Sequence, residues 1–388
     1  MIEGSKVDSD KRTLRYGMVG GGEGSFIGDV HRKVAAFDGK CRIVSGCFSN
    51  DFENTLRTGS NLNIEPKRLY KDFKTMAAAE GRKKDRIDFV VIVTPNYAHY
   101  DAAKAFLKAG INVVCEKPLV FKVKQAEELT RLAKEKDLLF CVAYCYSGYP
   151  LVKQARALVR DGSIGEILHV MGEFPQDWLI TPMEKEGQKQ AAWRTDPKLA
   201  GVSNCFGDLG SHIEHTVAYI TGLKIKSLIA RLDIIGEGRS LDTNGSVILN
   251  FSNGASGVYW ASQVAVGNDN ALKVRIYGTL GSIEWSQEDP NVMRVTHIGQ
   301  PVQILSRGHG YLDASAESRI PPGHTEGYFE SFANIYLKFA SALLKKKDGK
   351  ELTADDLDFP SLEAGTDGVK FINACVKSSK AGAIWVDL

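Results

Sequence analysis

The sequence predicts an α/β protein that begins with a doubly wound parallel sheet and continues into an α+β domain with a largely antiparallel, open sheet. A short apolar run at 16–19 breaks into glycines, and apolar residues then recur at helical spacing from 29 onward. Further apolar runs alternate with helical patterns up to residue 143, which is typical of a parallel sheet. After about residue 146 the pattern changes, and the 388 residues are enough for two domains.

The first domain takes its strands from short apolar runs and its helices from periodic ones. Strands are expected at 16–19, 42–48, 87–93, 111–115 and 138–143, with helices between them. Residues 1–11 lack periodicity and are expected to form a loose extension. Ligands of such sheets bind beyond the carboxyl ends of the strands. We therefore expect the loops that start at Gly20, Ser49, Thr94 and Glu116 to share one rim.

The second domain is expected to begin with a helix at 151–159, which ends at Asp161 and Gly162 and is followed by a long irregular segment. Strand runs at 247–251 and 255–260 flank Asn253 and Gly254, and Asn-Gly is a strong hairpin signal. Runs at 272–277 and 282–285 predict a second hairpin. This pattern predicts an antiparallel sheet with helices on one side. Lys345–Lys347 is interpreted as a solvated helix end.

Composition excludes several classes of partner. Lys and Arg number 49 against 47 Asp and Glu, so the net charge of +2 gives no basic footprint for nucleic acid. No apolar run approaches the roughly 20 residues of a membrane span. The first twelve residues lack the apolar stretch of a signal peptide, so we expect a cytoplasmic protein. The seven cysteines include no C-x-x-C pair and are expected to be buried, reduced thiols.

The glycine-rich segment lies between a strand and a helix, which is the context in which such a loop binds a pyrophosphate. Gly20 permits a tight turn and Gly22 lets the backbone approach the phosphates. Ser25 occupies the usual third glycine position, and a merely flexible turn is the alternative. After the second strand the chain offers Ser49-Asn50-Asp51 with no Lys or Arg immediately following. This favours NAD over NADP.

Three motifs in this order carry a resemblance. They are Gly20-Gly21-Gly22, Glu116-Lys117-Pro118 and Gly207-Asp208-Leu209-Gly210-Ser211-His212. Along nearly its whole length the chain resembles the Gfo/Idh/MocA oxidoreductases. Stretches at 22–28, 146–150, 193–197 and 322–328 are similar to bacterial sugar or (C-)glycoside 3-dehydrogenases. The resemblance implies an NAD(P)-binding Rossmann domain at 1–145 and a substrate-binding and oligomerisation domain at 146–388. An open sheet face that can pair suggests a homo-oligomer.

The resemblance also implies the catalytic residues Lys117, Asp208 and His212. Alcohol oxidation needs a base for the hydroxyl proton, and a lysine serves only when its pKa falls towards neutrality. Asp208 and His212 are four apart and are expected to face the same way on one helix turn. The alternatives are a surface lysine and a helix cap. The segment 202–206 lacks the glycine cluster common in the family. His212 with His215 is not interpreted as a metal site.

The other candidate residues are cofactor-binding or substrate-binding. The cofactor set is Gly20, Gly22, Ser25, Phe26, Ile27, Ser49, Asn50, Thr94, Asn96, His99, Glu116, Lys117, Trp193 and Arg194. The substrate set is Tyr149, Asp177, Trp178 and His324, whose aromatic and polar groups suit a polyol. The alternative for each aromatic residue is an ordinary core position.

The sequence therefore predicts an NAD(H)-dependent oxidoreductase that takes a hydride from a secondary alcohol of a sugar or glycoside. Oxidation at C3, giving a 3-keto product, is what the narrower resemblance implies. The alternatives are an NAD-dependent glycosidase that works through transient oxidation, an inositol dehydrogenase, and an NAD-sensing protein without turnover.

Overall fold

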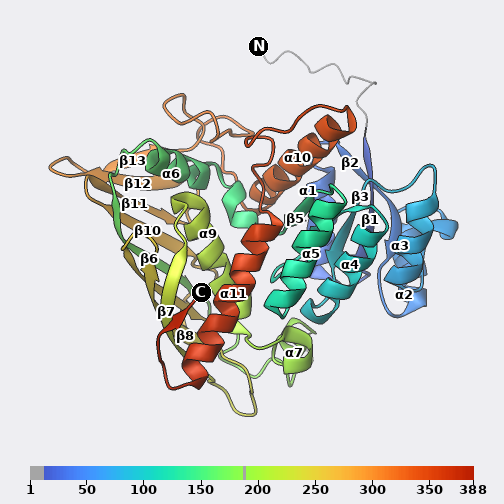
Figure 1. Ribbon diagram of the computed structural model, residues 1–388, viewed down its shortest axis with the longest axis horizontal. Coiled ribbons are helices and arrows are strands. Elements are labelled where there is room, and N and C mark those ends of the chain that lie inside the picture. Colours follow the sequence, from blue (N-terminus) through green and yellow to red (C-terminus); the bar gives the residue numbers. More distant parts are fainter. Residues whose placement is uncertain (1–12, 187–188) are drawn as a thin grey trace.

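The computed structural model describes residues 13–186 and 189–388 (Figure 1). The extension expected at 1–11 lies outside this range. The first sheet has five parallel strands in the order β2-β1-β3-β4-β5. They are β1 (Leu14–Gly20), β2 (Cys41–Cys47), β3 (Phe89–Val93), β4 (Asn112–Cys115) and β5 (Phe140–Val142). The order reverses between β1 and β3, so the loops after these two strands flank the crevice where ligands bind in such sheets.

Five helices connect these strands. They are α1 (Phe26–Ala36), α2 (Phe52–Asn61), α3 (Phe73–Arg82), α4 (His99–Lys108) and α5 (Val123–Glu135). Every residue of β3 is buried, as expected for a strand that is covered on both faces. The doubly wound parallel sheet is confirmed.

The second sheet has nine strands in the order β13-β12-β11-β10-β6-β9-β8-β7-β14, and β6 runs parallel to β9. They are β6 (Ile167–Pro175), β7 (Ile225–Asp233), β8 (Asn244–Phe251), β9 (Ser256–Ser262), β10 (Lys273–Gly278), β11 (Gly281–Ser286), β12 (Val292–His297), β13 (Gln303–Ser306) and β14 (Val386–Asp387). The expected hairpins are β8–β9 and β10–β11, and both are confirmed.

The prediction of a long irregular segment after Gly162 was wrong in part, because this segment contains the central strand β6. The inward positions of this strand include Gly172, where a Cβ atom would lie 2.3 Å from Ile213 Cγ2. A glycine is needed for this close approach, and it interrupts the alternation of apolar residues that identifies a strand from sequence.

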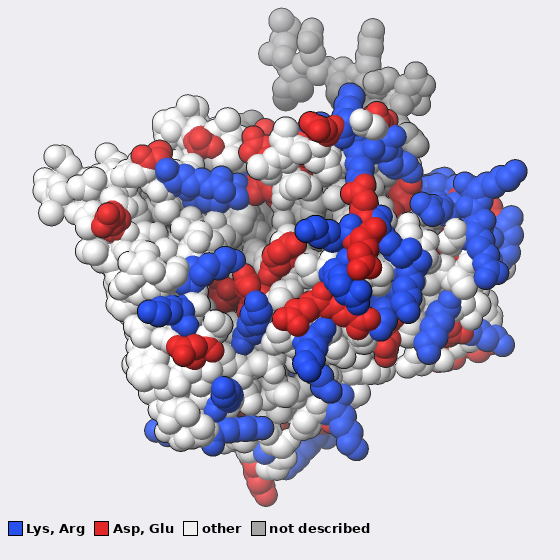
Figure 2. Space-filling model, in the orientation of Figure 1, with Lys and Arg blue, Asp and Glu red and all other residues white. Residues whose placement is uncertain are grey.

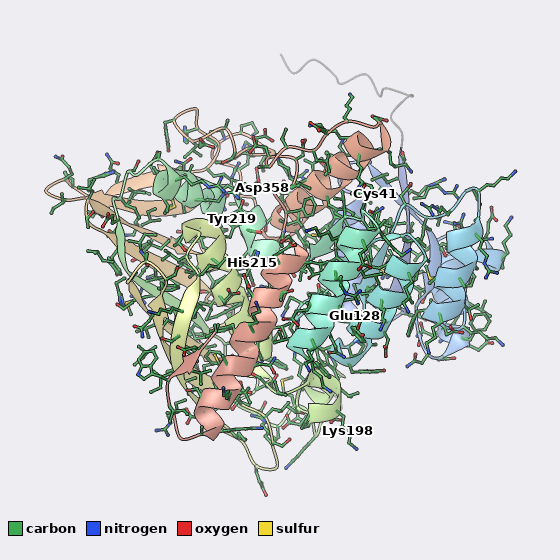
Figure 3. All side chains as sticks on the ribbon, viewed as in Figure 1. Cys41, Glu128, Lys198, His215, Tyr219 and Asp358 are labelled. Carbon is green, nitrogen blue, oxygen red and sulfur yellow. The ribbon has the colours of Figure 1, made fainter. Side chains whose placement is uncertain are left out.

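Helices α9 (Ser211–Thr221) and α11 (Leu362–Lys380) lie between the two sheets (Figure 1). The other helices after β5 are α6 (Pro150–Arg160), α10 (Tyr328–Lys347) and the short α7 (Lys189–Arg194) and α8 (Pro197–Ala200). The end of α10 carries Lys345–Lys347, as expected. Asp358, just before α11, accepts hydrogen bonds from Lys153 (2.7 Å), Arg156 (2.6 Å) and Tyr219 (3.0 Å), which ties this connection to α6 and α9 (Figure 3).

Helix α11 also completes the first domain. Val142 on β5 donates its N–H to Pro360 O at 2.9 Å, and Asn373 donates to Phe121 O at 3.2 Å. Leu362 and Val369 belong to the same buried apolar cluster as Val90 and Ile92 of the first sheet. The core that covers one face of the parallel sheet is therefore built partly from the end of the chain.

The distribution of surface charges and the burial of the cysteines match what the composition predicts. Acidic and basic side chains are interspersed over the helices of the first domain on the face in Figure 2. Within 13–186 and 189–388, no helix combines the length and the apolar character required to cross a membrane. All seven cysteines are buried and free, as expected.

Glu214 on α9 gives a prediction for stability. Burial, reinforced by the nearby Asp367, raises the pKa of Glu214 to about 8, while Lys224 acts in the opposite direction. A carboxyl group with a raised folded-state pKa contributes stability that is present at low pH and is lost as pH rises through that pKa. The free energy of unfolding of the parent should fall between pH 6 and pH 9. In Glu214→Gln we expect this fall to be smaller by on the order of 2 kcal/mol.

Denaturant unfolding at the two pH values measures this difference. Glu351→Gln, at an exposed position, is the control. Identical pH dependence in the parent and in Glu214→Gln would contradict the assignment.

Candidate active site

The glycine-rich loop has the conformation that its sequence requires. Gly20 and Gly21 have φ of +80° and +75°, a region that favours glycine. A Cβ atom on Gly28 would lie 2.3 Å from Gly21 Cα, so Gly28 permits the close approach of α1 to the loop. Ser25 begins the helix, since its Oγ accepts from Gly28 N at 3.2 Å. The first turn of α1 thus presents its N–H groups at the rim of the sheet.

Gly22 packs closely against α2 and the end of β2, and no space is left there for a side chain. A Cβ atom there would lie 2.4 Å from Asn54 Oδ1 and 3.0 Å from Phe48 O. The loop therefore folds against α2 and the end of β2, where Ser49 and Asn50 follow the strand. Asp51 begins α2 by accepting from Glu53 N at 3.0 Å.

A cavity of about 570 Å³ lies beside this loop and draws its lining from both sheets. Its size is within the range typical of small-molecule sites. The predicted residues that line it are Phe26, Ile27, Thr94, Asn96, Glu116, Lys117, Trp178, Trp193, Arg194, Asp208 and His212. The predicted residues outside its lining are Gly20, Gly22, Ser25, Ser49, Asn50, His99, Tyr149, Asp177 and His324.

Three residues expected to bind substrate have other contacts. Tyr149 is 1% exposed and its ring lies 5.2 Å from that of Trp285. Asp177 Oδ2 accepts from Gly267 N at 3.0 Å, and His324 is exposed, with its backbone oxygen accepting from Arg307. These contacts stabilise the walls and loops of the second domain.

His99, expected at the cofactor, is buried beneath the rim instead. Its Nδ1 lies 3.0 Å from Pro118 O and its Nε2 lies 2.8 Å from Thr94 O. Burial lowers the pKa of His99 and outweighs the opposite effect of these two carbonyl groups. The ring lies between the loop after β3 and the loop after β4, which carries Glu116 and Lys117, and in its neutral form it donates to one of the two carbonyl oxygens.

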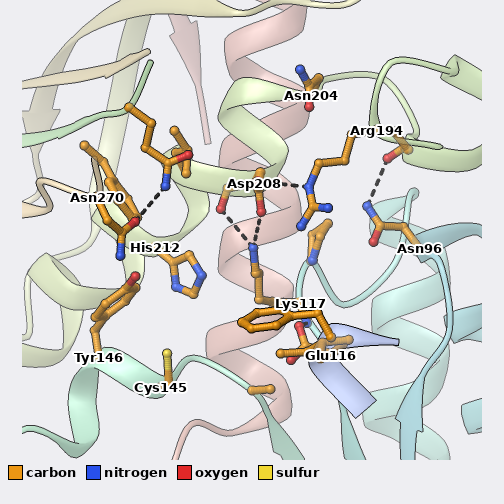
Figure 4. Close-up of a pocket in the computed structure, with 18 of the residues that line it drawn as sticks. Asn96, Glu116, Lys117, Cys145, Tyr146, Arg194, Asn204, Asp208, His212 and Asn270 are labelled. Atoms are coloured by element: carbon orange, nitrogen blue, oxygen red, sulfur yellow. Dashed lines mark hydrogen bonds and ion pairs between the residues drawn. The ribbon is translucent and has the colours of Figure 1, made fainter. Parts of the chain in front are cut away.

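An ion cluster lies at the centre of the cavity (Figure 4). Lys117 Nζ donates to Asp208 Oδ1, and Arg194 Nε donates to Asp208 Oδ2 at 3.1 Å. The Arg194 guanidinium also lies 4.4 Å from the centroid of the Trp193 ring. Glu116 accepts from His31 Nε2 at 2.8 Å and from Lys117 N at 3.1 Å, which fixes the backbone that carries the lysine.

The charge states of this cluster follow from its contacts. Burial acts to raise the pKa of Asp208, but the charges of Arg194 and Lys117 outweigh it and hold this pKa well below its ordinary value. Burial, with the charge of Lys117, lowers the pKa of His212 well below its ordinary value. At neutral pH the cavity therefore presents an ionised carboxylate beside a neutral imidazole.

Asp208 and His212 lie on different kinds of helical turn. Asp208 is in a π-helical turn (Phe206–Gly210) that precedes α9, whereas His212 is in the first turn of α9 itself. Asp208 is directed at Lys117 and Arg194, while the His212 ring packs edge-on against Tyr146, 4.8 Å between centroids. Within the described residues, His212 Nδ1 is buried and has no hydrogen-bond partner.

Asp242 determines the shape of the segment before Asp208, where the family's glycine cluster is missing. This buried carboxylate accepts from Ser203 Oγ at 2.9 Å, and from Asn204 N and Phe206 N at 3.0 Å each. Three donors converging on one carboxylate hold the loop that leads into the π-helical turn. Asp242 thus supplies the hydrogen-bond acceptors that hold this segment.

We expect Asp242→Asn to lower kcat by roughly 10-fold to 100-fold, because an amide cannot accept from all three donors and Asp208 would shift. KM for the dinucleotide should change less than threefold. Steady-state kinetics measure both, and Asp356→Asn at a distant surface turn is the control. An unchanged kcat in a folded Asp242→Asn protein would refute this positioning role.

Sequence reasoning missed several lining residues, among them Tyr146, Gln176, Asn204, Asn270, Gln287 and Tyr328. Tyr146 and Tyr328 lie in two of the stretches on which the narrower resemblance was argued, 146–150 and 322–328, so a signal was present for these two. The polar amides gave no such signal, because isolated Asn and Gln residues are ordinary surface residues.

The residues of the first domain fit a dinucleotide. The glycine loop has the φ angles of a pyrophosphate-binding turn, and α1 begins directly behind it. Thr94 Oγ1, on the cavity wall, is buried with no hydrogen-bond partner in the described part of the chain. A buried hydroxyl of this kind is normally satisfied by a ligand or water.

Comparison with known proteins agrees with this site. Residues 14–144 match the oxidoreductase family with an NAD-binding Rossmann fold, and residues 152–284 match the GFO/IDH/MocA C-terminal domain. The chain is 37% identical to the uncharacterized oxidoreductase YfiI of Bacillus subtilis, over 100% of this chain and 99% of that protein.

Two solved structures from Azotobacter vinelandii are similar over nearly the whole chain. An inositol dehydrogenase homolog complexed with NAD⁺ is 37% identical, with a TM-score of 0.93 and coverage of 100% of both chains. Another, complexed with NADH and myo-inositol, is 35% identical, with a TM-score of 0.90 and coverage of 97% and 98%. The chain therefore belongs to the GFO/IDH/MocA family and is an NAD(P)-dependent oxidoreductase.

Proposed function

We propose that the protein is an NAD(H)-dependent dehydrogenase for a secondary alcohol on a sugar, glycoside or related cyclic polyol. The observation that carries this proposal is the cluster of Lys117, Asp208 and His212 in one cavity. That cavity lies between the glycine-rich loop of the first domain and the polar wall of the second sheet. A reacting alcohol held there has a base and a hydrogen-bonding imidazole within reach.

The three side chains divide the proton chemistry between them. When bound, the nicotinamide accepts the hydrogen of the alcohol carbon as a hydride. Asp208 is a poor base because its pKa is held so low, and His212 is a poor one because burial also lowers its pKa. Lys117 is the proposed base. Its amine takes the hydroxyl proton only in the neutral form, after releasing its own proton to solvent, while His212 hydrogen-bonds the same oxygen.

Arg194 shares the carboxylate of Asp208 with this lysine, so the charge of Asp208 is not directed at Lys117 alone. The Trp193 ring lies 4.4 Å from the Arg194 guanidinium, and both residues line the cavity.

Two substrate classes are supported by different observations. The similar Azotobacter vinelandii protein was solved with NADH and myo-inositol, which favours an inositol as substrate. The sequence stretches shared with glycoside 3-dehydrogenases favour C3 of a pyranose ring, with a 3-keto product. Both substrates are uncharged rings with several neighbouring hydroxyl groups, and the first one to test is a glucoside.

A substrate screen tests this proposal. The purified protein with NAD⁺ is mixed with myo-inositol, methyl β-D-glucopyranoside and glucose, and NADH is followed by absorbance. We expect reduction with at least one of them, and NMR identifies the carbon oxidised. A lactone from glucose would refute oxidation at C3 and retain the dehydrogenase. Release of free sugar from an aryl glucoside without net NADH would indicate the glycosidase alternative instead.

NAD is proposed in preference to NADP. The residues that follow β2 are Ser49, Asn50 and Asp51, and a 2′-phosphate would meet a carboxylate there instead of a cation. Calorimetric titration with both cofactors tests this preference, and tighter binding of NADPH than of NADH would reverse it.

A homo-oligomer is proposed through the outer face of the second sheet. Ile248 on β8 and Ile304 on β13 are each 52% exposed, and Ile248 alternates with buried residues along its strand. Exposed apolar side chains on a broad sheet face are typical of an interface between subunits. Light scattering should give a dimer or larger assembly, and Ile248→Lys should shift it towards the monomer.

A further inference from the structure

Three amide side chains lie in a row on the wall of the cavity that belongs to the second sheet. Gln176 directly follows β6, Asn270 precedes β10, and Gln287 directly follows β11. Strands β6 and β10 are antiparallel neighbours, as are β10 and β11, so these chain ends meet at one edge of the cavity. Asn270, which is labelled in Figure 4, marks this edge. It lies beside His212 and across the cavity from Arg194.

The amides are joined in one direction. Trp178 Nε1 donates to Gln176 Oε1 at 2.8 Å, Gln176 Nε2 donates to Asn270 Oδ1 at 2.6 Å, and Asn270 Nδ2 lies 3.4 Å from Gln287 Oε1. An indole N–H can only donate, so Gln176 must present its oxygen to Trp178 and its nitrogen to Asn270. This order propagates along the row and fixes the orientation of each amide.

This arrangement leaves N–H donors for a ligand. Each amide nitrogen carries two hydrogens, and the row uses one hydrogen each of Gln176 and Asn270. The second hydrogen of Gln176 remains for a ring oxygen, whereas Asn270 also contacts the hydroxyl of Tyr146, which lines the cavity beside it. Asp269, next to Asn270, also lines the cavity and supplies a carboxylate acceptor. A hydroxyl group that accepts from an amide and donates to a carboxylate satisfies both, whereas a phosphate would be repelled by Asp269.

We propose that Gln176, Asn270 and Gln287 are the specificity-determining wall of this site, and that they select an uncharged ring with neighbouring hydroxyl groups over a phosphorylated sugar. This inference rests on the proposed dehydrogenase function and deepens it. Trp178 acts as a positioning residue, because it sets the orientation of the row. Asn270 lies beside His212 and across the cavity from Lys117, so the residues that read the substrate adjoin those that oxidise it.

The test is a set of double-mutant cycles on Asn270. In the parent, removing from the substrate the hydroxyl that Asn270 reads should lower kcat/KM by roughly 100-fold, because a buried amide is left unpaired. Asn270→Leu should lower kcat/KM for the intact substrate by a similar factor. The same deoxy substitution should then cost less than about fivefold, since the two groups are coupled. The substrates are methyl β-D-glucopyranoside, its 2-, 4- and 6-deoxy analogues, and myo-inositol.

The controls separate this inference from the function itself. Asn268→Leu lies in the same loop, where Asn268 donates to Ala265 O and does not line the cavity, and it should behave as the parent. Asn270→Asp keeps the side-chain shape and one acceptor, and it replaces Asn270→Leu if that variant does not fold. Trp178→Phe should reduce the discrimination between intact and deoxy substrates while leaving NADH affinity unchanged.

Binding is measured apart from turnover, by calorimetric titration of the NADH complex with methyl β-D-glucopyranoside, myo-inositol and glucose 6-phosphate. If Asn270→Asp weakens the affinity for a neutral ring about tenfold, the result supports the role of this wall. It does so even if no substrate is oxidised, and in that case only the dehydrogenase proposal fails. Three results would overturn the inference. In Asn270→Leu, every deoxy analogue could lose as much kcat/KM relative to the intact substrate as every other. The parent could bind glucose 6-phosphate more tightly than the neutral rings, or bind neither neutral ring.

Discussion

Replacing Lys117 with Met should lower kcat for the substrate found in the screen by roughly 100-fold to 10,000-fold. Methionine keeps the length of the side chain and removes the amine, so no group at that position can take the hydroxyl proton. Asp208 and His212 cannot replace it, because both have lowered pKa values. Affinity for NADH should change by less than about threefold, since the glycine loop and α1 are untouched.

The measurement is single-turnover kinetics with NAD⁺, together with calorimetric titration of NADH. Lys124→Met, at an exposed position on α5, is the matched control and should retain full activity. A small primary amine added to Lys117→Met should restore part of the rate, which a purely structural role of the lysine would not allow. Turnover within threefold of the parent would refute the assignment of Lys117 as the base.

Replacing Gly28 with Val should abolish cofactor binding, with Kd for NADH raised by at least roughly 100-fold. A Cβ atom at this position would lie 2.3 Å from Gly21 Cα and 2.8 Å from Gly21 O, and both contacts are with backbone. Neither can be relieved by rotating a side chain, so α1 must move away from the loop. The N–H groups of the first helical turn would then no longer face the pyrophosphate.

Gly310→Val is the control, because a Cβ atom there has open space around it and the backbone needs no positive φ. Circular dichroism establishes that Gly28→Val is folded before binding is measured. A folded Gly28→Val protein with an unchanged Kd for NADH would show that the cofactor does not use this loop.

The parallel sheet and its rim could be predicted from sequence because their signals are local. Each strand of the first domain is a short apolar run, and the loops of Gly20, Thr94 and Lys117 follow strands directly. Once the sheet is parallel, these loops must meet at one edge. Lys117 and Asp208 each belong to a motif that carries the family resemblance, so we expected them to act together. In the structure the two side chains form an ion pair.

The substrate wall could not be predicted, because it depends on strand order in the second sheet. Gln176 and Asn270 are far apart in sequence, and they meet only because β6 and β10 are neighbours. Strand β6 itself gave no clear signal, since Gly172 replaces an apolar residue at an inward position. Tyr149, Asp177 and His324 were chosen for their residue type alone, and residue type does not determine which way a side chain points.

The packing of α11 against the first sheet has a consequence for the order of folding during synthesis. The ribosome releases the five parallel strands early, but Pro360, Leu362 and Val369, which pack against this sheet, emerge only after strands β6 to β13. Domains usually fold in the order in which they are translated. Here the nascent first domain must wait for most of the chain with one apolar surface uncovered. Until α11 emerges, the apolar residues of the first sheet that contact Leu362 and Val369 lack this cover, and a transiently exposed apolar surface favours aggregation.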